Sequence, residues 1–232
     1  MLFRQMFDQE SSTYTYFLAS RVGGEALIID PVKEKLNDYL MLISQLKLKL
    51  VKAIDTHTHA DHITALGSLR ELTGCVTLMG EFTKAECVSA QVADGELIDV
   101  DGIRLQAIFT PGHTNESFSF LLQPDKPRAV FTGDALLIRG SGRTDFQGGD
   151  PYKSYDSIVN KLFKLPDDTT VYPAHDYKGW LSSSIGEERQ HNPRLAGKSA
   201  SQYAAIMNSL NLPNPKMMDI AVPANLACGN PT

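Results

Sequence analysis

The chain has 232 residues, of which 42% are hydrophobic and 21% are charged, so it can bury a sizeable core and does not have the composition of a disordered protein. Its 22 Lys and Arg residues against 27 Asp and Glu give a formal net charge of -5, which argues against nucleic acid and anionic membranes as partners. No apolar run approaches the ~20 residues of a membrane-spanning helix, and the first residues resemble neither a signal peptide nor a transit peptide.

The first half of the chain predicts two strands followed by two helices. Alternating residues predict strands over 13–18 and 25–30, and the Gly-Gly pair between them predicts a hairpin turn. Apolar residues at helical spacing predict a helix over 33–47. A repeat of leucines predicts a further helix that ends at Gly74.

The second half of the chain predicts three more helices. Asp150 followed by Pro151 is a favourable helix start, because an N-cap residue precedes proline at the first helical position. Ser184 and Glu187 form a capping-box pattern ahead of a short helix. The last predicted helix covers residues 201–210. No repeat or linker divides the chain, so one domain is expected.

Four short β-prone runs each lead into a residue that could bind a metal ion. These residues are His57, His113, Asp134 and His175. Side chains at the carboxyl ends of strands converge above one edge of a sheet, where α/β folds tend to bind ligands. Strands also hold side chains more rigidly than loops do. The sequence therefore predicts a metal site at a sheet edge.

Three of the six histidines lie in one H-x-H-x-D-H run, which contains His57, His59, Asp61 and His62. Histidine is the commonest metal ligand, because neutral imidazole offers a lone pair near pH 7. Alternating residues in an extended turn let two rings face one ion. A purely structural role is not expected for so dense a cluster, whereas His191 is interpreted as an ordinary histidine.

The three cysteines, Cys75, Cys87 and Cys228, are odd in number and show no C-x-x-C spacing. They are predicted to be free thiols in a reducing compartment. This favours the cytoplasm of a bacterium or, if a transit peptide was removed, the mitochondrial matrix.

The ordered set of motifs resembles the metallo-β-lactamase superfamily. The motifs are H-x-H-x-D-H at 57–62, Pro-Gly-His at 111–113, Gly-Asp at 133–134 and Pro-Ala-His at 173–175. This resemblance implies an α+β fold of the αββα sandwich type, in which two mixed β-sheets are flanked by helices. It covers nearly the whole chain and implies a single domain over residues 1–232.

The superfamily resemblance alone leaves the reaction open, because there are enough ligands for two metal ions. A first ion would be bound by His57, His59, His113 and Asp134, and a second by Asp61, His62, His175 and a shared Asp134. This is the pattern of a dinuclear zinc thioester hydrolase such as glyoxalase II. Two ions would activate a bridging hydroxide for attack on the thioester carbonyl.

Finer detail resembles the persulfide dioxygenases, also called sulfur dioxygenases, of the same superfamily. The segments that carry this resemblance are FTGDALLIRGSGRTDFQ at 131–147, YPAHDY at 172–177, the motifs within 187–195, and AVPAN at 221–225. The chain ends soon after the last segment, so it is expected to lack the longer helical region with which glyoxalase II enzymes hold glutathione.

The persulfide dioxygenase resemblance implies one Fe(II) per chain, bound by His57, His113 and Asp134. Two histidines and one carboxylate form the facial triad of non-haem iron oxygenases, which leaves positions open for oxygen and substrate. The remaining candidates would be outer-shell groups that orient the ligands. They are His59, Asp61, His62 and His175.

The same resemblance implies oxidation of glutathione persulfide with O2 and water to sulfite and glutathione, as in sulfide catabolism. Glutathione carries two carboxylates, so Arg143 and Tyr177 are interpreted as substrate-binding residues. The alternatives are an ion pair of Arg143 with Asp145 or Asp150, and a half-buried core position for Tyr177.

A homodimer and a separate sulfurtransferase that delivers the persulfide are compatible with the resemblance. Coenzyme A persulfide is an alternative substrate, and a non-catalytic metal-binding protein is a third, less favoured class.

Overall fold

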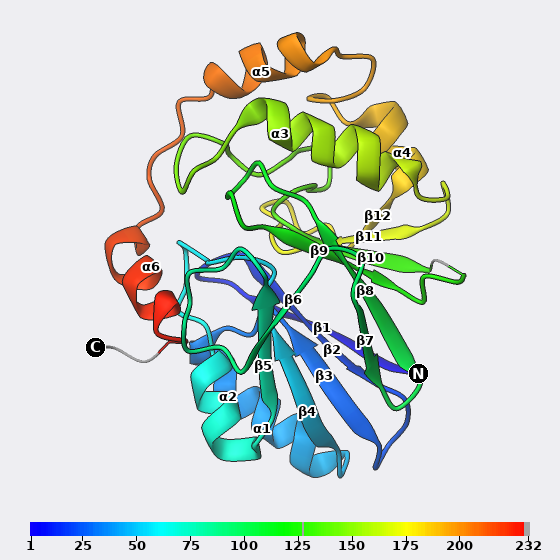
Figure 1. The fold of residues 1–232 in the computed structure, drawn as a ribbon, viewed down its shortest axis with the longest axis vertical. Coiled ribbons are helices and arrows are strands. Elements are labelled where there is room, and N and C mark those ends of the chain that lie inside the picture. The colour runs from blue at the N-terminus through cyan, green and yellow to red at the C-terminus, as the bar shows by residue number, and fades with distance from the viewer. Residues whose placement is uncertain (127, 230–232) are drawn as a thin grey trace. The chain divides into compact units, whose positions relative to one another are not determined.

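The computed structural model describes residues 1–126 and 128–229, which fold into two compact units (Figure 1). The first unit comprises Met1–Val92, Ile98–Arg104 and the chain from Asn214, and the second comprises Ala93–Leu97 and Leu105–Pro213. The sequence predicts one domain over residues 1–232, and positions 127 and 230–232 of that range lie outside the described residues. The grouping of both units into one domain stays a prediction.

The first unit is built on a six-stranded mixed sheet in the order β1-β2-β3-β4-β5-β6. The strands are β1 Leu2–Asp8, β2 Thr13–Ala19, β3 Glu25–Ile29, β4 Lys49–Ile54, β5 Val76–Gly80 and β6 Ala90–Val92. The pairs β1–β2 and β2–β3 are antiparallel, and the remaining pairs are parallel. The predicted hairpin is confirmed, because β2 and β3 are its two strands.

Two helices of the first unit, α1 Leu36–Gln45 and α2 Leu66–Thr73, pack on this sheet (Figure 1). Their buried residues, such as Tyr39 and Leu66, share one hydrophobic core with residues of β2 and β3. The predicted helix over 33–47 is confirmed, and it begins with a short 3-10 turn at Lys33–Lys35. The end of α2 at Gly74 is also confirmed. Gly74 has φ +72°, a left-handed conformation that glycine adopts without strain.

A helix that the sequence analysis missed, α6 Met218–Leu226, also belongs to the first unit. The prediction that residues 201–210 form the last helix was therefore wrong. Pro223 lies inside α6 and explains the error, because proline lacks the N–H that a helix needs and usually interrupts one. Here contacts with distant parts of the unit stabilise the helical segment.

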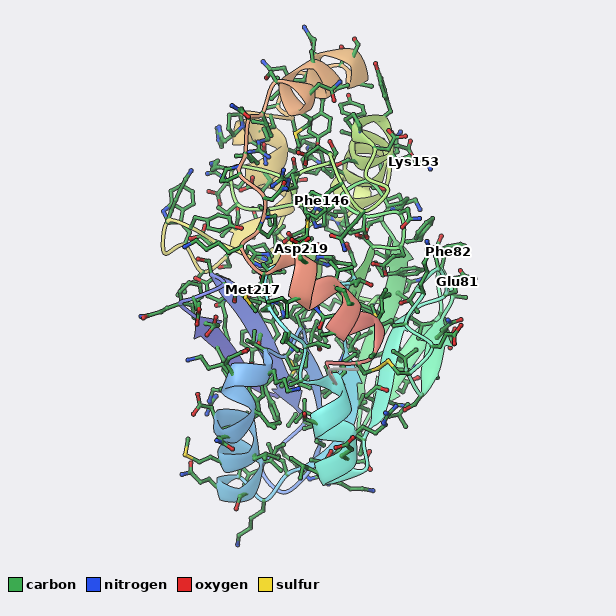
Figure 2. All side chains as sticks on the ribbon, turned by 90° about the vertical axis from the view of Figure 1, so that its left-hand side faces the viewer. Glu81, Phe82, Phe146, Lys153, Met217 and Asp219 are labelled. Atoms are coloured by element: carbon green, nitrogen blue, oxygen red, sulfur yellow. A yellow bond between two sulfur atoms is a disulfide. The ribbon has the colours of Figure 1, made fainter. Side chains whose placement is uncertain are left out.

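The cysteine prediction was wrong for two of the three residues. Cys87 and Cys228 form a disulfide across a sequence separation of 141, and only Cys75 among the described residues is a free, buried cysteine. The yellow bond beside α6 in Figure 2 is this disulfide. No local spacing pattern could pair residues so far apart, because their proximity is created by the folding of the unit. The bond also removes the argument from free thiols for a reducing compartment.

The second unit contains most of another six-stranded mixed sheet, in the order β12-β11-β10-β9-β8-β7. The strands are β7 Leu97–Val100, β8 Ile103–Phe109, β9 Phe118–Leu122, β10 Ala129–Gly133, β11 Thr170–Pro173 and β12 Ser183–Ser184. The β10–β11 pair is parallel, and the pairs β8–β9, β9–β10 and β11–β12 are antiparallel. The three predicted ligand strands of this unit, β8, β10 and β11, are confirmed.

The second unit contains the helices α3 Pro151–Asp156, α4 Ile185–His191 and α5 Ala200–Asn208, of which α3 and α4 lie beside the sheet and α5 packs against α3 (Figure 1). Their predicted starts are confirmed. The Asp150 carboxylate accepts hydrogen bonds from the backbone N–H of Tyr152 at 2.8 Å and of Lys153 at 3.2 Å. Ser184 Oγ accepts one from the Glu187 N–H at 3.2 Å. Two mixed sheets flanked by helices agree with the predicted fold class.

Across residues 1–126 and 128–229, no helix has the length and apolar character needed to cross a membrane.

Candidate metal centre

The histidine run lies on the loop between β4 and α2, which we call the ligand loop (residues 55–64). His57, His59 and His62 are all buried. The ring centroids of His57 and His59 are 4.2 Å apart, and those of His59 and His62 are 4.3 Å apart. The loop has no regular secondary structure, so its backbone depends on tertiary hydrogen bonds to hold these rings in place.

Asp30 fixes the orientation of His57 through Thr56. The Asp30 carboxylate accepts hydrogen bonds from the Thr56 backbone N–H at 2.7 Å and from the Thr56 hydroxyl at 3.1 Å. Because this hydroxyl donates its proton to Asp30, it acts as the acceptor in its 2.9 Å contact with His57 Nδ1. His57 therefore carries its proton on Nδ1 and keeps the Nε2 lone pair available for a metal ion.

His59 lies among carboxylates of the same unit. Its Nε2 atom is 3.1 Å from the Asp30 carboxylate, and its buried Nδ1 has no hydrogen-bond partner among the described residues. Burial by itself would lower the pKa of His59, but the carboxylates of Asp30, Asp55 and Asp61 outweigh it and raise this pKa to about 9. Possible ligand atoms of His59, Asp61 and His62 lie within 4.8 Å of one another. The field of these carboxylates favours a cation at the ligand loop.

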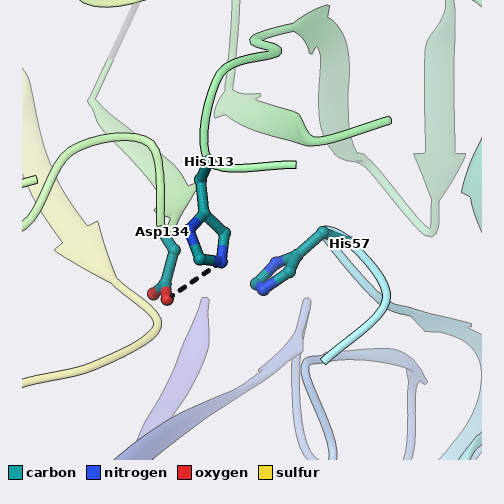
Figure 3. Close-up of side chains that lie close together, drawn as sticks. All are labelled: His57, His113 and Asp134. Carbon is teal, nitrogen blue, oxygen red and sulfur yellow. Dashed lines mark ion pairs between the residues drawn. The ribbon is translucent and has the colours of Figure 1, made fainter. Parts of the chain in front are cut away.

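His113 follows β8 in the second unit, where the Pro111-Gly112 turn directs it away from the strand. Its Nδ1 atom lies 2.7 Å from the Arg143 carbonyl oxygen. A carbonyl can only accept, so the proton is on Nδ1, and Nε2 keeps its lone pair. This Nε2 atom is 3.5 Å from Asp134 Oδ2, the pair of atoms that the dashed line joins in Figure 3. Figure 3 also draws His57 on its own loop.

Asp134 directly follows β10 and is oriented by His175, which follows β11. His175 Nδ1 donates to Asp134 Oδ1 at 2.7 Å. This bond occupies one carboxylate oxygen and leaves Oδ2 on the side of His113. Asp134 is therefore arranged to bind a metal through one oxygen while His175 holds the other.

Gly142 allows the chain to pass directly behind both groups. A Cβ atom at this position would lie 2.2 Å from the Asp134 carbonyl oxygen and 2.8 Å from His113 Nδ1. The Gly142 N–H donates to the same Asp134 carbonyl at 2.8 Å. Only glycine fits between the backbone of one candidate ligand and the ring of the other, so residues 140–143 form a tight support for this half of the site.

A buried ion pair between Glu188 and Arg139 anchors the segment of residues 140–143. Glu188 is fully buried, pairs with Arg139 and accepts hydrogen bonds from the Ser183 hydroxyl at 2.6 Å and the Asn192 amide at 2.9 Å. Asn192 also donates to the Gly140 carbonyl at 2.9 Å. Because the buried Glu188 carboxylate and the buried Asn192 amide both have hydrogen-bond partners, the network can fix the chain between Asp134 and Arg143.

The side chain of Arg143 makes the ion pair that the sequence analysis considered as an alternative role. Its Nε and one terminal nitrogen donate to the two Asp145 carboxylate oxygens, each at 2.6 Å, and its other terminal nitrogen donates to the Pro213 carbonyl at 2.7 Å. The Arg143 hydrogen bond keeps the pKa of Asp145 below its usual value. Of the two carboxylates considered, Asp145 is therefore the partner of Arg143.

Tyr177 is 73% exposed, so the alternative of a half-buried core aromatic was wrong. Its ring stacks on His175 with centroids 6.1 Å apart and an angle of 4° between the planes. An exposed aromatic ring that lies over a candidate outer-shell histidine is available to a ligand.

The structure thus assembles the predicted residues within each unit. The first unit brings together His57, His59, Asp61 and His62, and the second brings together His113, Asp134, His175, Arg143 and Tyr177. The sequence analysis missed Asp30, Thr56 and Glu188 as supporting residues. A signal for Asp30 existed, because it ends the second predicted strand just as the four candidate ligands follow theirs.

Comparison with known proteins gives consistent likenesses. A family model described as the metallo-beta-lactamase superfamily matches residues 88–175. The chain is 46% identical to the persulfide dioxygenase ETHE1, mitochondrial, of Mus musculus and 45% identical to that of Homo sapiens, and each comparison covers 99% of this chain and 89% of the relative. The crystal structure of ETHE1 from Myxococcus xanthus matches with a TM-score of 0.95 and 51% identity, covering 99% of this chain and 100% of that chain.

Proposed function

Since the chain belongs to the persulfide dioxygenase family of the metallo-β-lactamase superfamily, we propose that it oxidises glutathione persulfide with O2 and water to sulfite and glutathione. The observation that carries this proposal is the 46% identity over 99% of the chain to a protein named as a persulfide dioxygenase. The family and the metallo-β-lactamase fold predicted from the sequence are both confirmed.

We propose that His57, His113 and Asp134 bind one Fe(II) per chain. The donor chemistry fits this ion, because each histidine has its Nδ1 proton engaged with a protein oxygen and offers Nε2. Asp134 offers Oδ2, since His175 occupies Oδ1. Two imidazole nitrogens and one carboxylate oxygen make the facial triad of non-haem iron oxygenases. In this proposal His59, Asp61, His62 and His175 are outer-shell groups.

When bound, iron would supply redox chemistry and open coordination positions for the reaction with O2. In the overall reaction the outer sulfur of the persulfide is oxidised to sulfite, O2 is reduced, the S–S bond breaks, and glutathione leaves as the thiol. The role of the protein is to hold the ligand atoms at fixed positions, which requires the bonds of Thr56 to His57 and of Arg143 to His113.

The zinc hydrolase of glyoxalase II type remains a defined alternative that the comparisons do not favour. His59, Asp61 and His62 lie close enough to act as ligands of a second ion. His175, which a dinuclear site would also need, donates from Nδ1 to Asp134, and this bond fits a ligand through Nε2 as well as an outer-shell group.

Metal content and oxygen uptake separate the two functions. For protein expressed with iron and zinc both available, we expect about one iron per chain by plasma mass spectrometry and oxygen uptake on addition of glutathione persulfide. Zinc-loaded protein should not consume oxygen, because zinc has no redox chemistry. About two zinc ions per chain, no uptake, and cleavage of S-lactoylglutathione would instead establish the hydrolase.

We propose that Arg143 and Tyr177 bind the substrate. The Arg143 guanidinium is held by the Asp145 carboxylate and by the carbonyls of Pro213 and Leu212, which fixes its position and leaves one of its five N–H donors for a glutathione carboxylate. The exposed ring of Tyr177 supports a second contact beside His175.

Replacing Arg143 by alanine is expected to raise the KM for glutathione persulfide about fivefold or more with a smaller change in kcat, because a binding contact is lost. Steady-state oxygen uptake measures both constants. Asp145→Asn is the matched control, since it breaks the ion pair and keeps the guanidinium. If Arg143 only serves the ion pair, the two variants will have the same KM, and a wild-type KM for Arg143→Ala would remove this residue from the binding site.

Three finer points are also proposed. The two units act as one domain, in keeping with a likeness to ETHE1 of Myxococcus xanthus that spans 99% of this chain. The protein is a homodimer that receives persulfide from a separate sulfurtransferase. It works in the cytoplasm or the mitochondrial matrix, and the second location is supported by the mitochondrial designation of the mammalian relatives.

A further inference from the structure

The carboxyl-terminal helix of the first unit contacts the ligand loop through one buried amide, that of Asn225. Asn225 Nδ2 donates to the carbonyl oxygens of His59 and His62, both at 2.9 Å. Asn225 Oδ1 accepts from the backbone N–H of Thr64, also at 2.9 Å. Asn225 is 3% exposed, so these bonds do not compete with bulk water.

The ligand loop has a particular need for these bonds. Its backbone lies outside both β4 and α2, and its β-type pairing within the described residues is limited to the isolated bridge between Thr64 and Val32. The Asp30 carboxylate holds the start of the loop through the Thr56 N–H, and Asn225 holds its second half at three backbone groups. Without the amide, two buried carbonyls and one buried N–H would lose their partners.

The end of α6 that carries Asn225 is itself fixed at several points. Cys228 is bonded to Cys87 through the disulfide, and its carbonyl accepts from the Gly67 N–H at 2.9 Å. The Lys33 side chain donates to the Gly229 carbonyl. Figure 2 faces α6, which begins beside the labelled Met217 and Asp219. A helix end anchored in this way can hold a loop rigidly, whereas an unattached tail could not.

We propose that Asn225 is a positioning residue of the metal centre, which sets the geometry of the histidine rings by holding the ligand-loop backbone. This inference rests on one part of the proposed function, namely that the ligand loop binds a metal ion, and it does not depend on the reaction that the metal supports. Asn225 contacts no reacting group, and it acts through His59, His62 and, along the same short loop, His57. Ligand positions must hold to within about half an ångström for full activity, so loss of the amide reduces metal affinity and turnover together.

The test replaces Asn225 by aspartate, which has the same shape but presents an oxygen to the two carbonyls in place of the N–H donor. Cobalt(II) serves as the probe, because its visible absorption reports binding to nitrogen and oxygen ligands whichever metal the protein naturally holds. We expect the Kd of Co(II), measured by competition with a chelator, to rise ~10-fold or more. The kcat of the iron-loaded variant should fall by a similar factor while the KM for persulfide stays unchanged.

Two further variants keep the result interpretable. Asn225→Ala removes all three bonds without adding an oxygen, and it should weaken Co(II) binding in the same direction if the aspartate variant does not fold. Ala221→Gly loosens α6 but leaves the Asn225 amide in place, so it should lower the Tm without changing the Kd of Co(II).

Wild-type Co(II) affinity in Asn225→Asp, or an equal loss of affinity in Ala221→Gly at an equal loss of Tm, would overturn the positioning role. Oxygen uptake by the wild-type protein tests the proposed function separately. Should the wild type consume no oxygen while Asn225→Asp still loses Co(II), the proposed function fails and the positioning role stands.

Discussion

Replacement of His113 by alanine is expected to remove the metal from the protein and to abolish oxygen uptake with glutathione persulfide. The change deletes the Nε2 atom that is proposed to bind the metal and that lies 3.5 Å from Asp134 Oδ2. It also deletes the ring whose Nδ1 donates to the Arg143 carbonyl, so this supporting contact is lost as well. The fall in activity should exceed the ~100-fold that substitution of an outer-shell group can cost. Metal content per chain and oxygen uptake on the same sample measure the two effects.

The matched control for this experiment is His191→Ala. His191 is the last residue of α4 and is exposed, so its loss should leave metal content and uptake unchanged. If His113→Ala kept a full complement of iron and wild-type uptake, the proposed ligand set would be wrong. A loss of metal in both variants would point to general instability instead of a missing ligand.

Gly142→Ala is expected to disrupt the same half of the site without changing any polar group. The added Cβ would lie 2.2 Å from the Asp134 carbonyl oxygen and 2.8 Å from His113 Nδ1, and real side chains do not approach backbone this closely. The segment must therefore shift, which breaks the 2.8 Å bond from the Gly142 N–H to the Asp134 carbonyl. Overpacking of this severity should cost about 3 kcal/mol or more of unfolding free energy, together with loss of the metal. Thermal unfolding and metal content are the measurements.

Gly140→Ala provides the control two residues away. A Cβ at Gly140 would meet its nearest neighbour, a carbon of Leu137, at 3.9 Å, which is ordinary van der Waals contact. This variant should retain wild-type stability and metal content. If Gly142→Ala behaved like Gly140→Ala, the close approach behind His113 and Asp134 would not be needed for the metal centre.

Much of the fold could be predicted because its signals are local. The β2–β3 hairpin follows from alternation and a glycine turn, α2 ends at a glycine with a positive φ, and Asp150 caps α3 through its own side chain. Each of these features involves residues close together in the chain, where sequence spacing and geometry are directly related. The exception, α6, has Pro223 in its interior and is stabilised by contacts that no local pattern records.

The candidate ligands could be identified for a similar reason. His57, His113, Asp134 and His175 each lie within four residues of the end of a strand, so the strand ends bring them to the edges of the sheets. Which ring nitrogen is available could not be predicted from sequence, because it depends on distant partners. Thr56 and Asp30 decide it for His57, and the Arg143 carbonyl decides it for His113.

The sequence by itself determined the family, the strand-end positions of the ligands and most of the regular elements, because these depend on residue types at short spacing. Only the tertiary structure decided the Cys87–Cys228 disulfide, the engagement of Arg143 with Asp145, and the hold of Asn225 on the ligand loop. The disulfide and the Asn225 contacts join residues more than a hundred positions apart in the chain. Arg143 had two carboxylates nearby in sequence, and the fold of its loop selected between them. Such pairings arise when the chain folds back on itself to bury its core, and one-dimensional spacing carries no record of them.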